Sequence, residues 1–335
     1  MDPCSQALLG ASLSCSFSKK KDLSKASICG LAGGFFPDLD IIIKSENDPL
    51  LFLEYHRHFT HSLFFVPIGG LIVSGILYIS FFRKKTSFSK IYLFSSLGIF
   101  THGLLDACTS YGTSLYWPFS NERVSWNIIS IIDPIFTLIL ILGFIFCIKL
   151  KSKIYSQIGF LFSIVYLMLG LFKHNLTLEF VKNLSNERGH EIERFFLNPT
   201  IGNNILWRSI YQFEGSYYVD AIYMPLISPA KFKKGSSVNK IDKENHFQHI
   251  KSNSQLIVDI DRFSFFSQGY IYFHPDFRNV IADLRYGTLP FDLNSLWGIE
   301  INEEKQDSHV EFKNLRNFKS FHYKEFWEML KGNLN

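Results

Sequence analysis

Hydrophobic and polar positions are distributed unevenly along the 335 residues of this chain. Up to about residue 172 the sequence consists mainly of long apolar runs, whereas the remainder alternates in short runs, as in a soluble domain. A helix needs about 20 apolar residues to cross a bilayer. The pattern therefore predicts an α-helical membrane protein, with a multi-helix transmembrane domain over residues 1–172 and a smaller soluble domain over residues 173–335.

The apolar half divides into five or six segments, all of which we expect to be helical. They cover residues 4–18, 26–43, 62–82, 91–108, 128–148 and 154–172. The first segment is too short to span a bilayer comfortably, and the second is interrupted by Gly33-Gly34 and by Pro37. The third segment is the cleanest transmembrane candidate.

Three basic clusters separate these segments and set the expected topology. They are Lys19–Lys25, Arg83–Lys90 and Lys149–Lys153. Because cytoplasmic loops of membrane proteins carry an excess of lysine and arginine, we place all three clusters in the cytoplasm. The crossings then alternate, and residues 173–335 fall on the non-cytoplasmic side. The expected location is a bacterial-type inner membrane, crossed several times.

The polar half predicts a small α+β domain rich in β-structure. Short runs of aromatic and β-branched residues at 205–211, 217–223, 263–273 and 280–286 are typical of strands. Residues 173–194 resemble an amphipathic helix or stalk, and residues 229–254, rich in Lys, Ser and Asn, indicate a loop. We expect an antiparallel sheet accompanied by a helix or two.

Composition narrows the classes of function. The net charge is only +4, and the lysines gather beside apolar segments, which indicates membrane topology and no nucleic-acid partner. The five cysteines form no CxxC pair, so neither a zinc ribbon nor a disulfide framework is supported. No P-loop, GxGxxG or GxSxG motif is present, which leaves nucleotide, dinucleotide and serine-hydrolase functions without support.

Three polar signatures interrupt the apolar sequence between residues 36 and 106. They are Pro37–Asp40, His56–Ser62 and Thr101–Asp106. Their carboxylates and imidazoles are ligands for zinc, manganese or iron(II). Ionisable groups at membrane depth are costly and therefore mark candidate functional sites. The topology also puts all three signatures on the non-cytoplasmic face, which favours one composite metal site.

The histidines give the sharpest signals. His102 and Asp106 are four residues apart and share one face of a helix, although a buried polar pair that locks helix packing would have the same spacing. His56, His58 and His61 fall within six residues, and we expect at least one of them to be a ligand.

The acidic and arginine candidates have strong structural alternatives. Asp38 and Asp40 are either ligands or carboxylates that cap a helix. Asp133 precedes Pro134, as a helix cap commonly does, so a catalytic role for it is the weaker interpretation. Arg57 and Arg123 either clamp a phosphate or carboxylate, or bind lipid headgroups or a structural aspartate.

Together, these motifs resemble a known family, the membrane-bound metal-dependent hydrolases of the YdjM type. The resemblance covers roughly the first 140 residues, in spacing as well as identity. The matching positions are Met1–Pro3, Gln6–Gly10, Pro37–Asp40, His56-Arg57 with Phe59–Ser62, Thr101-His102 with Leu105-Asp106, Thr109–Thr113, Trp117–Ser120, Arg123 with Trp126-Asn127, and Ile132–Pro134.

The resemblance implies an integral membrane protein with a metal site, remotely similar to that of zinc-dependent phospholipase C and P1-type nucleases. The ligands that it implies are Asp38, Asp40, His56, His61, His102 and Asp106. Two positions depart from the family pattern. Gln6 stands where many relatives have His, and His58 stands where Gly is usual, which makes His58 the weakest ligand candidate of the three histidines.

The working hypothesis is a metal-dependent hydrolase, with a divalent metal and zinc foremost. Asp38 or Asp40 would act as general base, and Arg57 or Arg123 would steady an anionic group. A site at the outer face of the membrane favours a lipid or lipid-linked phosphoester as substrate. The alternative is a non-enzymatic membrane protein that uses the His and Asp residues as a structural metal site or as an ion or proton relay.

Overall fold

The computed structural model describes residues 1–316 and 322–334. They divide into two compact units. Unit 1 comprises Met1–Ile43, Tyr55–Phe172 and Ile201–Asn203, and unit 2 comprises Lys44–Glu54, Lys173–Thr200 and Asn204–Asn335. The predicted succession of a helical first part and a β-rich second part is confirmed.

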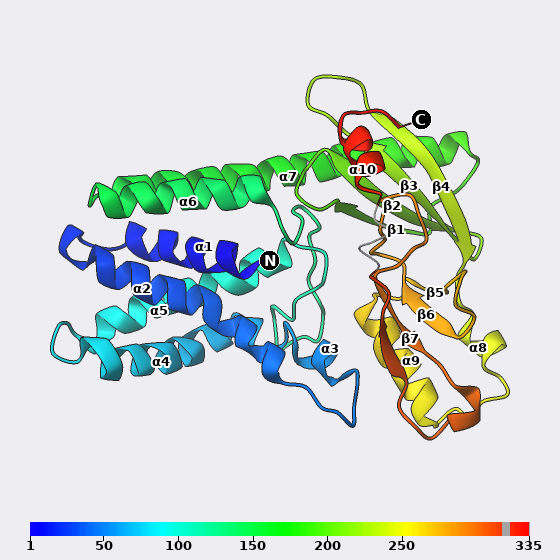
Figure 1. Cartoon of the computed structure of the whole chain (residues 1–335), viewed down its shortest axis with the longest axis horizontal. Coiled ribbons are helices and arrows are strands. Elements are labelled where there is room, and N and C mark those ends of the chain that lie inside the picture. Colours follow the sequence, from blue (N-terminus) through cyan, green and yellow to red (C-terminus); the bar gives the residue numbers. More distant parts are fainter. Residues whose placement is uncertain (317–321, 335) are drawn as a thin grey trace. The chain divides into compact units, whose positions relative to one another are not determined.

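Unit 1 is a bundle of helices (Figure 1). Its helices are α1 (Pro3–Ser16), α2 (Leu23–Phe35), α4 (Phe65–Leu77), α5 (Phe88–Ala107), α6 (Pro134–Lys149) and the first part of α7 (Lys153–Glu187). A π-helical turn, Tyr78–Phe82, continues α4. Three short 3-10 turns complete the unit, namely η1 (Lys20–Asp22), η2 (Phe36–Ile42) and η3 (Phe59–His61).

Glycines allow α1, α2 and α5 to approach one another closely. A Cβ atom at Gly98 of α5 would lie 2.6 Å from the carbonyl oxygen of Gly30 in α2. A Cβ atom at Gly34 of α2 would lie 2.4 Å from the carbonyl oxygen of Gln6 in α1. Real Cβ atoms need more room than this, so side chains at these positions would force the helices apart. The close packing brings the end of α2 against the polar part of α5.

Two of the described helices are long and apolar enough to cross a membrane, Phe65–Phe82 and Lys153–Glu187. The helix Pro134–Lys149 is apolar but shorter. Large apolar side chains on these helices are open to the surroundings, with Ile79 72% and Leu161 60% exposed. Such exposure suits a lipid-facing surface better than the core of a soluble protein. The other predicted segments contain helices that do not meet the same criterion.

Unit 2 contains two antiparallel four-stranded sheets. The first has the order β1 (Arg194–Pro199), β2 (Leu206–Phe213), β3 (Ser216–Tyr223), β4 (Lys231–Asn239). The second has the order β5 (Ile271–Phe273), β6 (Val280–Asp283), β7 (Trp297–Glu300), β8 (Glu311–Asn314). One apolar cluster joins both sheets and includes Tyr217 of β3 and Tyr270 beside β5. The described helices of this part are α3 (Leu51–Tyr55), α8 (Lys243–His246), α9 (Gln255–Phe266) and α10 (Tyr323–Leu330).

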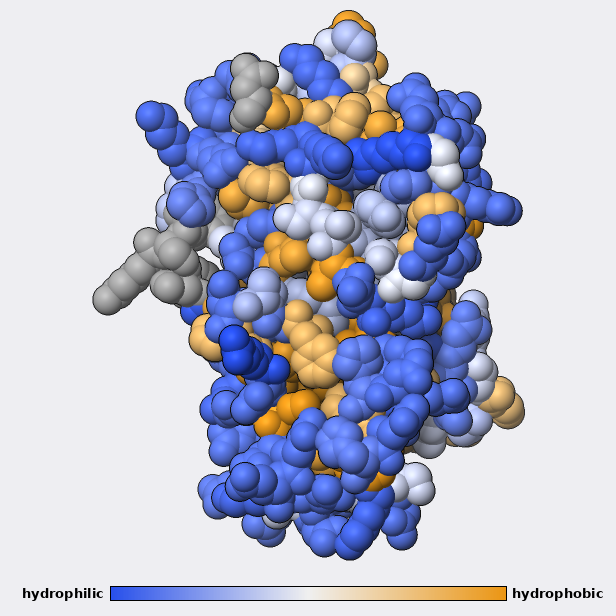
Figure 2. Space-filling model, turned by 90° about the vertical axis from the view of Figure 1, so that its right-hand side faces the viewer, coloured by the Kyte–Doolittle hydropathy of each residue, from blue (hydrophilic) through white to orange (hydrophobic). Residues whose placement is uncertain are grey.

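One face of unit 2 is mainly hydrophilic. Figure 2 shows one face of it, where hydrophilic side chains predominate and apolar groups emerge only between them. The end of α7 packs on the first sheet, because Val181 and Leu184 join a buried cluster with Trp207 and Tyr211.

The sequence predicted three strands of unit 2 well and two regions poorly. Residues 206–211 and 217–223 lie in β2 and β3, and the first four residues of the predicted run 280–286 form β6. The run 263–273 is not one strand, because α9 extends to Phe266 and only Ile271–Phe273 is extended. Residues 229–254 are not simply a loop, because β4 lies within them as an edge strand. An edge strand with polar side chains avoids pairing with other molecules, which explains its loop-like composition.

Candidate metal centre

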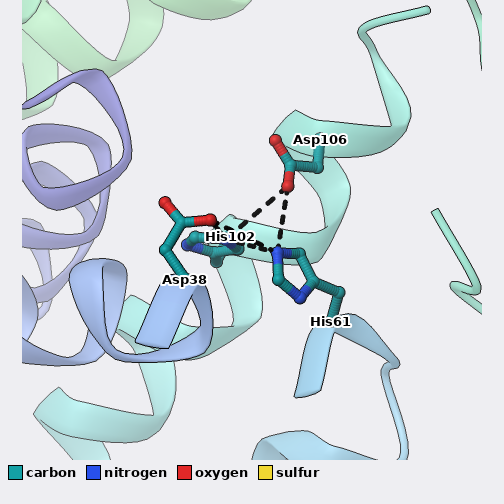
Figure 3. A group of neighbouring side chains, drawn as sticks. All are labelled: Asp38, His61, His102 and Asp106. Carbon is teal, nitrogen blue, oxygen red and sulfur yellow. Dashed lines mark hydrogen bonds and ion pairs between the residues drawn. The ribbon is translucent and has the colours of Figure 1, made fainter. Parts of the chain in front are cut away.

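Four side chains from three elements of unit 1 meet at one point (Figure 3). Asp38 comes from η2, His61 from η3, and His102 and Asp106 from α5. One ligand atom from each lies within 4.8 Å of the others, so these four residues, the His/Asp group, could hold a metal ion. Within residues 1–316 and 322–334, no other cluster of three or more such residues has this geometry. All members except Asp38 are buried.

Local structure explains why the three elements converge. His102 and Asp106 are one helical turn apart and point to the same side of α5. Pro37 is the second residue of η2, which follows α2 directly, so the chain turns at the end of that helix. Gly103 allows η3 to lie against α5, since a Cβ atom there would be 2.1 Å from the carbonyl oxygen of His61.

The spacing of the ligand atoms fits a tetrahedral metal ion. The Nε2 atoms of His61 and His102 are 2.9 Å apart, and they lie 3.1 and 3.6 Å from Oδ2 of Asp106. Their distances to Oδ1 of Asp38 are 3.6 and 3.4 Å. Ligands at about 2.0–2.1 Å from a tetrahedral zinc ion are roughly 3.3–3.4 Å apart. The observed distances between ligand atoms, 2.9 to 3.6 Å, lie on both sides of that value.

Hydrogen bonds at the far side of each ring fix the histidine tautomers. Nδ1 of His102 is 2.6 Å from the carbonyl oxygen of Gly34 and must donate to it. Nδ1 of His61 is 3.2 Å from Oδ2 of Asp40, which offers only acceptor atoms. In the neutral rings both Nε2 atoms therefore carry lone pairs, and these face each other. This is the arrangement in which outer partners orient metal-binding histidines.

Several buried oxygen atoms in and beside the group have no hydrogen-bond partner, although Oδ2 of Asp106 forms an ion pair with Arg57. They include Oδ2 of Asp38, Oδ2 of Asp106 and Oε1 of Gln6. A buried acceptor without a partner is costly and calls for an explanation such as an ion. The chemistry of these atoms, two of them carboxylate oxygens, suits a cation.

The electrostatic surroundings of His61 also favour positive charge. Burial by itself lowers the pKa of His61, but interactions with Asp106, Asp38 and Asp40 outweigh it and raise the pKa to about 10. Three carboxylates around one imidazole thus attract a cation to this position.

The structure places Asp40 and His56, two of the six predicted ligands, beside the His/Asp group. His56 Nδ1 is 2.8 Å from Oδ1 of Asp40. Oδ2 of Asp40 accepts hydrogen bonds from the backbone N–H of Arg57 at 3.0 Å and from Thr60 at 2.9 Å. Both oxygens of Asp40 are thus engaged, and through His61 this carboxylate orients a member of the group.

The two predicted arginines have different partners. Arg57 is buried, its Nε is 3.3 Å from Oδ2 of Asp106, and its Nη1 donates to Thr109 at 2.8 Å. Arg123 Nη2 donates to the carbonyl oxygen of Gly112 at 2.8 Å. Arg57 is thus tied to the His/Asp group, whereas this contact ties Arg123 to the backbone of the 109–133 loop.

Two other candidates have structural partners. The carboxylate of Asp133 caps α6 by accepting from the N–H groups of Ile135 and Phe136, and it also accepts from Tyr166 at 2.8 Å. The ring of His58 packs against Trp117, with centroids 5.6 Å apart.

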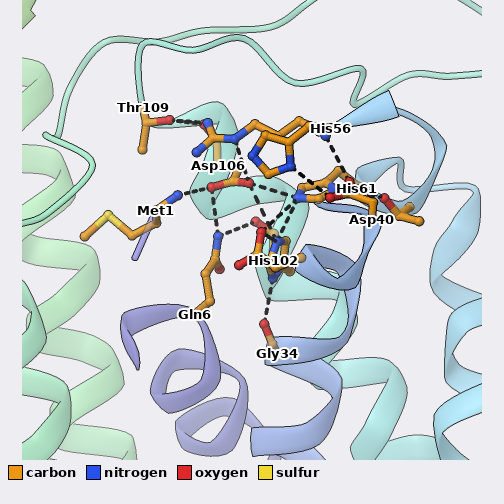
Figure 4. Close-up of polar contacts among 12 residues, drawn as sticks. Met1, Gln6, Gly34, Asp40, His56, His61, His102, Asp106 and Thr109 are labelled. Carbon is orange, nitrogen blue, oxygen red and sulfur yellow. Dashed lines mark hydrogen bonds and ion pairs between the residues drawn. The ribbon is translucent and has the colours of Figure 1, made fainter. Parts of the chain in front are cut away.

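Figure 4 shows further residues that contact the His/Asp group and whose contacts could not be predicted from the sequence. Gln6 donates to Oδ1 of Asp106 at 2.9 Å, and the amino group of Met1 contacts the same carboxylate. The carbonyl of Gly34 and the hydroxyl of Thr60 orient the two histidines. The pair Gly33-Gly34 just before Pro37 was a signal for close backbone approach, but nothing in the sequence identified its partner.

Comparisons with known proteins agree with this picture of the first half of the chain. Residues 1–177 match the model of a family described as YdjM inner membrane protein. The chain is also 29% identical, over 199 residues, to the uncharacterized protein YfhP of Bacillus subtilis (strain 168). That match covers 57% of this chain and 57% of the relative, so the chain spans little more than half the relative's length. No solved structure matches the chain.

Proposed function

This chain belongs to the YdjM inner membrane protein family, and we propose that it is a metal-dependent hydrolase whose centre is the His/Asp group. The observation that carries the proposal is the convergence of two imidazoles and two carboxylates, with the two Nε2 atoms 2.9 Å apart and buried carboxylate oxygens that lack hydrogen-bond partners. Asp38, His61, His102 and Asp106 would hold a divalent metal, with zinc as the first candidate for a mixed nitrogen and oxygen ligand set.

A bound divalent ion would polarise the scissile bond and lower the pKa of a water molecule to near neutrality. The residues of the chain have separate tasks. Asp38, with its side chain 16% exposed, is the member of the group most open to the surroundings, and its Oδ2 is the atom that would take a proton. Asp40 orients His61, and Arg57 balances the charge of Asp106. We assign Arg123 to an anionic group of the substrate.

The proposed substrate is a lipid or a lipid-linked phosphoester. Support comes from apolar side chains that are exposed beside the acidic residues of η2, namely Leu39 (42%), Ile41 (65%) and Ile42 (74%). Exposed apolar groups next to a polar centre suit a substrate with an apolar chain and a polar head.

We further propose that unit 1 crosses the inner membrane several times. The connections α1–α2, α4–α5 and α6–α7, which carry the basic clusters, lie at the same end of the bundle in Figure 1. The His/Asp group lies where α5 ends, after the chain has crossed back from that basic end. By the positive-inside rule the centre and unit 2 would then be on the non-cytoplasmic side.

A structural metal site is the second candidate, and one observation favours it. Four protein ligands can complete a tetrahedral coordination, as in closed structural zinc sites, whereas catalytic sites usually keep a position for water. In that case the metal would join η2, η3 and α5, and its removal would unfold unit 1.

The test uses the full chain in detergent micelles, loaded with zinc and incubated with phosphatidic acid, a lysophospholipid and a polyprenyl phosphate ester. We expect hydrolysis of at least one of these substrates, and its loss in Asp38→Asn, which removes both a charged metal ligand and the proposed general base. The matched control is Glu122→Gln, an exposed acid of unit 1. Absence of hydrolysis, combined with a large fall in melting temperature on chelation, would favour the structural role.

A further inference from the structure

The segment Lys44–Glu54 connects the two turns that carry ligands of the His/Asp group. Asp38 and Asp40 precede it on η2, and His56 and His61 follow it. Although its neighbours in sequence belong to unit 1, this segment belongs to unit 2. The position of one stretch of unit 2 is therefore linked through the backbone to both turns.

Arg262 of α9 holds this segment with three hydrogen bonds. Its Nη1 and Nη2 atoms donate to the two carboxylate oxygens of Asp48 at 3.0 and 2.7 Å, and its Nε donates to Glu54 at 2.6 Å. The bidentate arrangement is the most directional form of an arginine–carboxylate pair. Arg262 thus grips Asp48 in the middle of the segment and Glu54 at its end.

A buried aspartate on the same helix fixes the side chain of Arg262. Asp259, one turn earlier on α9, is fully buried and accepts from Nη1 of Arg262 at 2.9 Å. The other oxygen of Asp259 accepts from the backbone N–H of Val310 at 3.1 Å and lies 2.9 Å from Nδ1 of His309. The guanidinium therefore has a fixed orientation before it meets the segment.

Apolar contacts fix the same segment. The side chain of Leu50 is fully buried, and Phe52 packs edge-on against Phe312 of β8 with ring centroids 5.0 Å apart. Burial of the Leu50 side chain and of part of the Phe52 ring contributes more than exposed charge pairs do. The apolar contacts hold the segment on unit 2, while the directional bonds of Arg262 set its exact course.

A strained residue lies shortly after the segment. Arg57, three residues beyond Glu54, has a φ of +63°. This left-handed backbone conformation is rare for residues other than glycine. In this conformation its N–H donates to Asp40, and its Nε lies beside Asp106. Such a conformation persists only where the surroundings hold the backbone on both sides.

We infer that Arg262 is a positioning residue, and that its grip on Asp48 and Glu54 sets the spacing of η2 and η3 and thereby the metal affinity of the His/Asp group. This inference rests on the proposed function, because it takes the group to be a metal centre. It gives unit 2 a role in that centre although unit 2 contributes no ligand to it.

The test compares Arg262→Leu and Arg262→Lys with the wild type, as full chains in detergent micelles. Arg188→Leu is the matched control. The side chain of Arg188 is 18% exposed, close to the 16% of Arg262, and it donates two hydrogen bonds to the carboxylate of Asp220, a residue of β3. Hydrogen exchange is followed in metal-free protein over residues 36–43 and 55–62. Zinc affinity is measured by competition with a chromophoric chelator.

We expect Arg262→Leu to accelerate exchange in both turns and to weaken zinc binding by about tenfold, the lower end of what outer partners of metal ligands contribute. Arg262→Lys should be intermediate, because it keeps the charge without the fork of donors. Arg188→Leu should change neither. Unchanged exchange in Arg262→Leu, or faster exchange with unchanged zinc affinity, would overturn the inference. A wild type that binds no zinc would instead refute the metal centre, and the exchange data would still decide whether Arg262 positions the turns.

Discussion

Nε2 of His61 and Nε2 of His102 lie 2.9 Å apart, while the opposite nitrogen of each ring faces an acceptor. Two lone pairs at this distance repel unless a cation lies between them. A shared proton would satisfy the two nitrogens but would leave Oδ2 of Asp38 without a hydrogen-bond partner and Oδ2 of Asp106 with only its ion pair to Arg57. A divalent ion would satisfy all four groups, which is why we favour a metal over a proton relay.

Neutralising Asp40 should weaken metal binding without abolishing it. In Asp40→Asn, His61 loses the charged acceptor of its Nδ1, and Arg57 loses that of its backbone N–H. Outer carboxylates of metal-binding histidines typically contribute 10- to 100-fold in affinity, so we expect zinc binding to weaken by about that factor at unchanged stoichiometry. Competition with a chelator measures this. An affinity equal to that of wild type would show that Asp40 is not a partner of the centre.

Adding one methyl group at Gly103 should disturb both the fold and the centre. The new Cβ atom would lie 2.1 Å from the carbonyl oxygen of His61, so η3 must move. Overpacking of this kind costs about 1–3 kcal/mol of stability, and the shift of His61 should weaken zinc binding. The matched control is Gly75→Ala, because a Cβ atom at Gly75 of α4 meets nothing within 4 Å. Equal melting temperatures and zinc affinities for the two variants would contradict the described packing of η3 on α5.

The basic end of unit 1 should show a defined dependence on pH. Asp22 of η1 is bonded to Lys90 at 2.7 Å and to Lys25 at 3.1 Å. The bond from Lys90, together with Lys25, lowers the pKa of Asp22 despite its burial. A lowered native pKa stabilises the fold at neutral pH, and this contribution is lost as the pH falls through the acid range.

Asp22→Asn should therefore cost about 0.5–1 kcal/mol at pH 7, because the lysines are partly solvated. The difference in melting temperature between the variant and the wild type should shrink toward pH 3. A difference that is independent of pH would show that the charge of Asp22 contributes nothing.

The sequence identified the residues that meet in the His/Asp group better than it identified the contacts of each one. The spacing of His102 and Asp106 on an apolar helix identified them directly, and both belong to the His/Asp group. Asp40 could not be distinguished from Asp38, because both follow Pro37 and only the course of η2 decides which one faces His102. The part played by Gly34 depends on contacts between helices that no local pattern reveals.

Local sequence patterns also predicted the strands only in part. Residues 217–223 are apolar and β-branched and fold as β3. The aromatic residues before Phe266 form a helix instead, because Ser254 caps it and Leu256, Ile260 and Phe263 recur at helical spacing on its buried side. A run of aromatic residues is therefore ambiguous until its neighbours on both sides are considered. The assignment of the segment 44–54 to unit 2 was not foreseeable, because Arg262 lies more than 200 residues away in sequence.

The most direct test of the account is the metal content of the full chain purified in detergent. Elemental analysis of the wild type should find a divalent metal in stoichiometric amount, with zinc as the first candidate. The variants His102→Ala and Asp106→Ala should each lose it while remaining folded by circular dichroism. A wild type that is free of metal after purification without chelators and after incubation with zinc, with both variants equally stable, would contradict the metal centre.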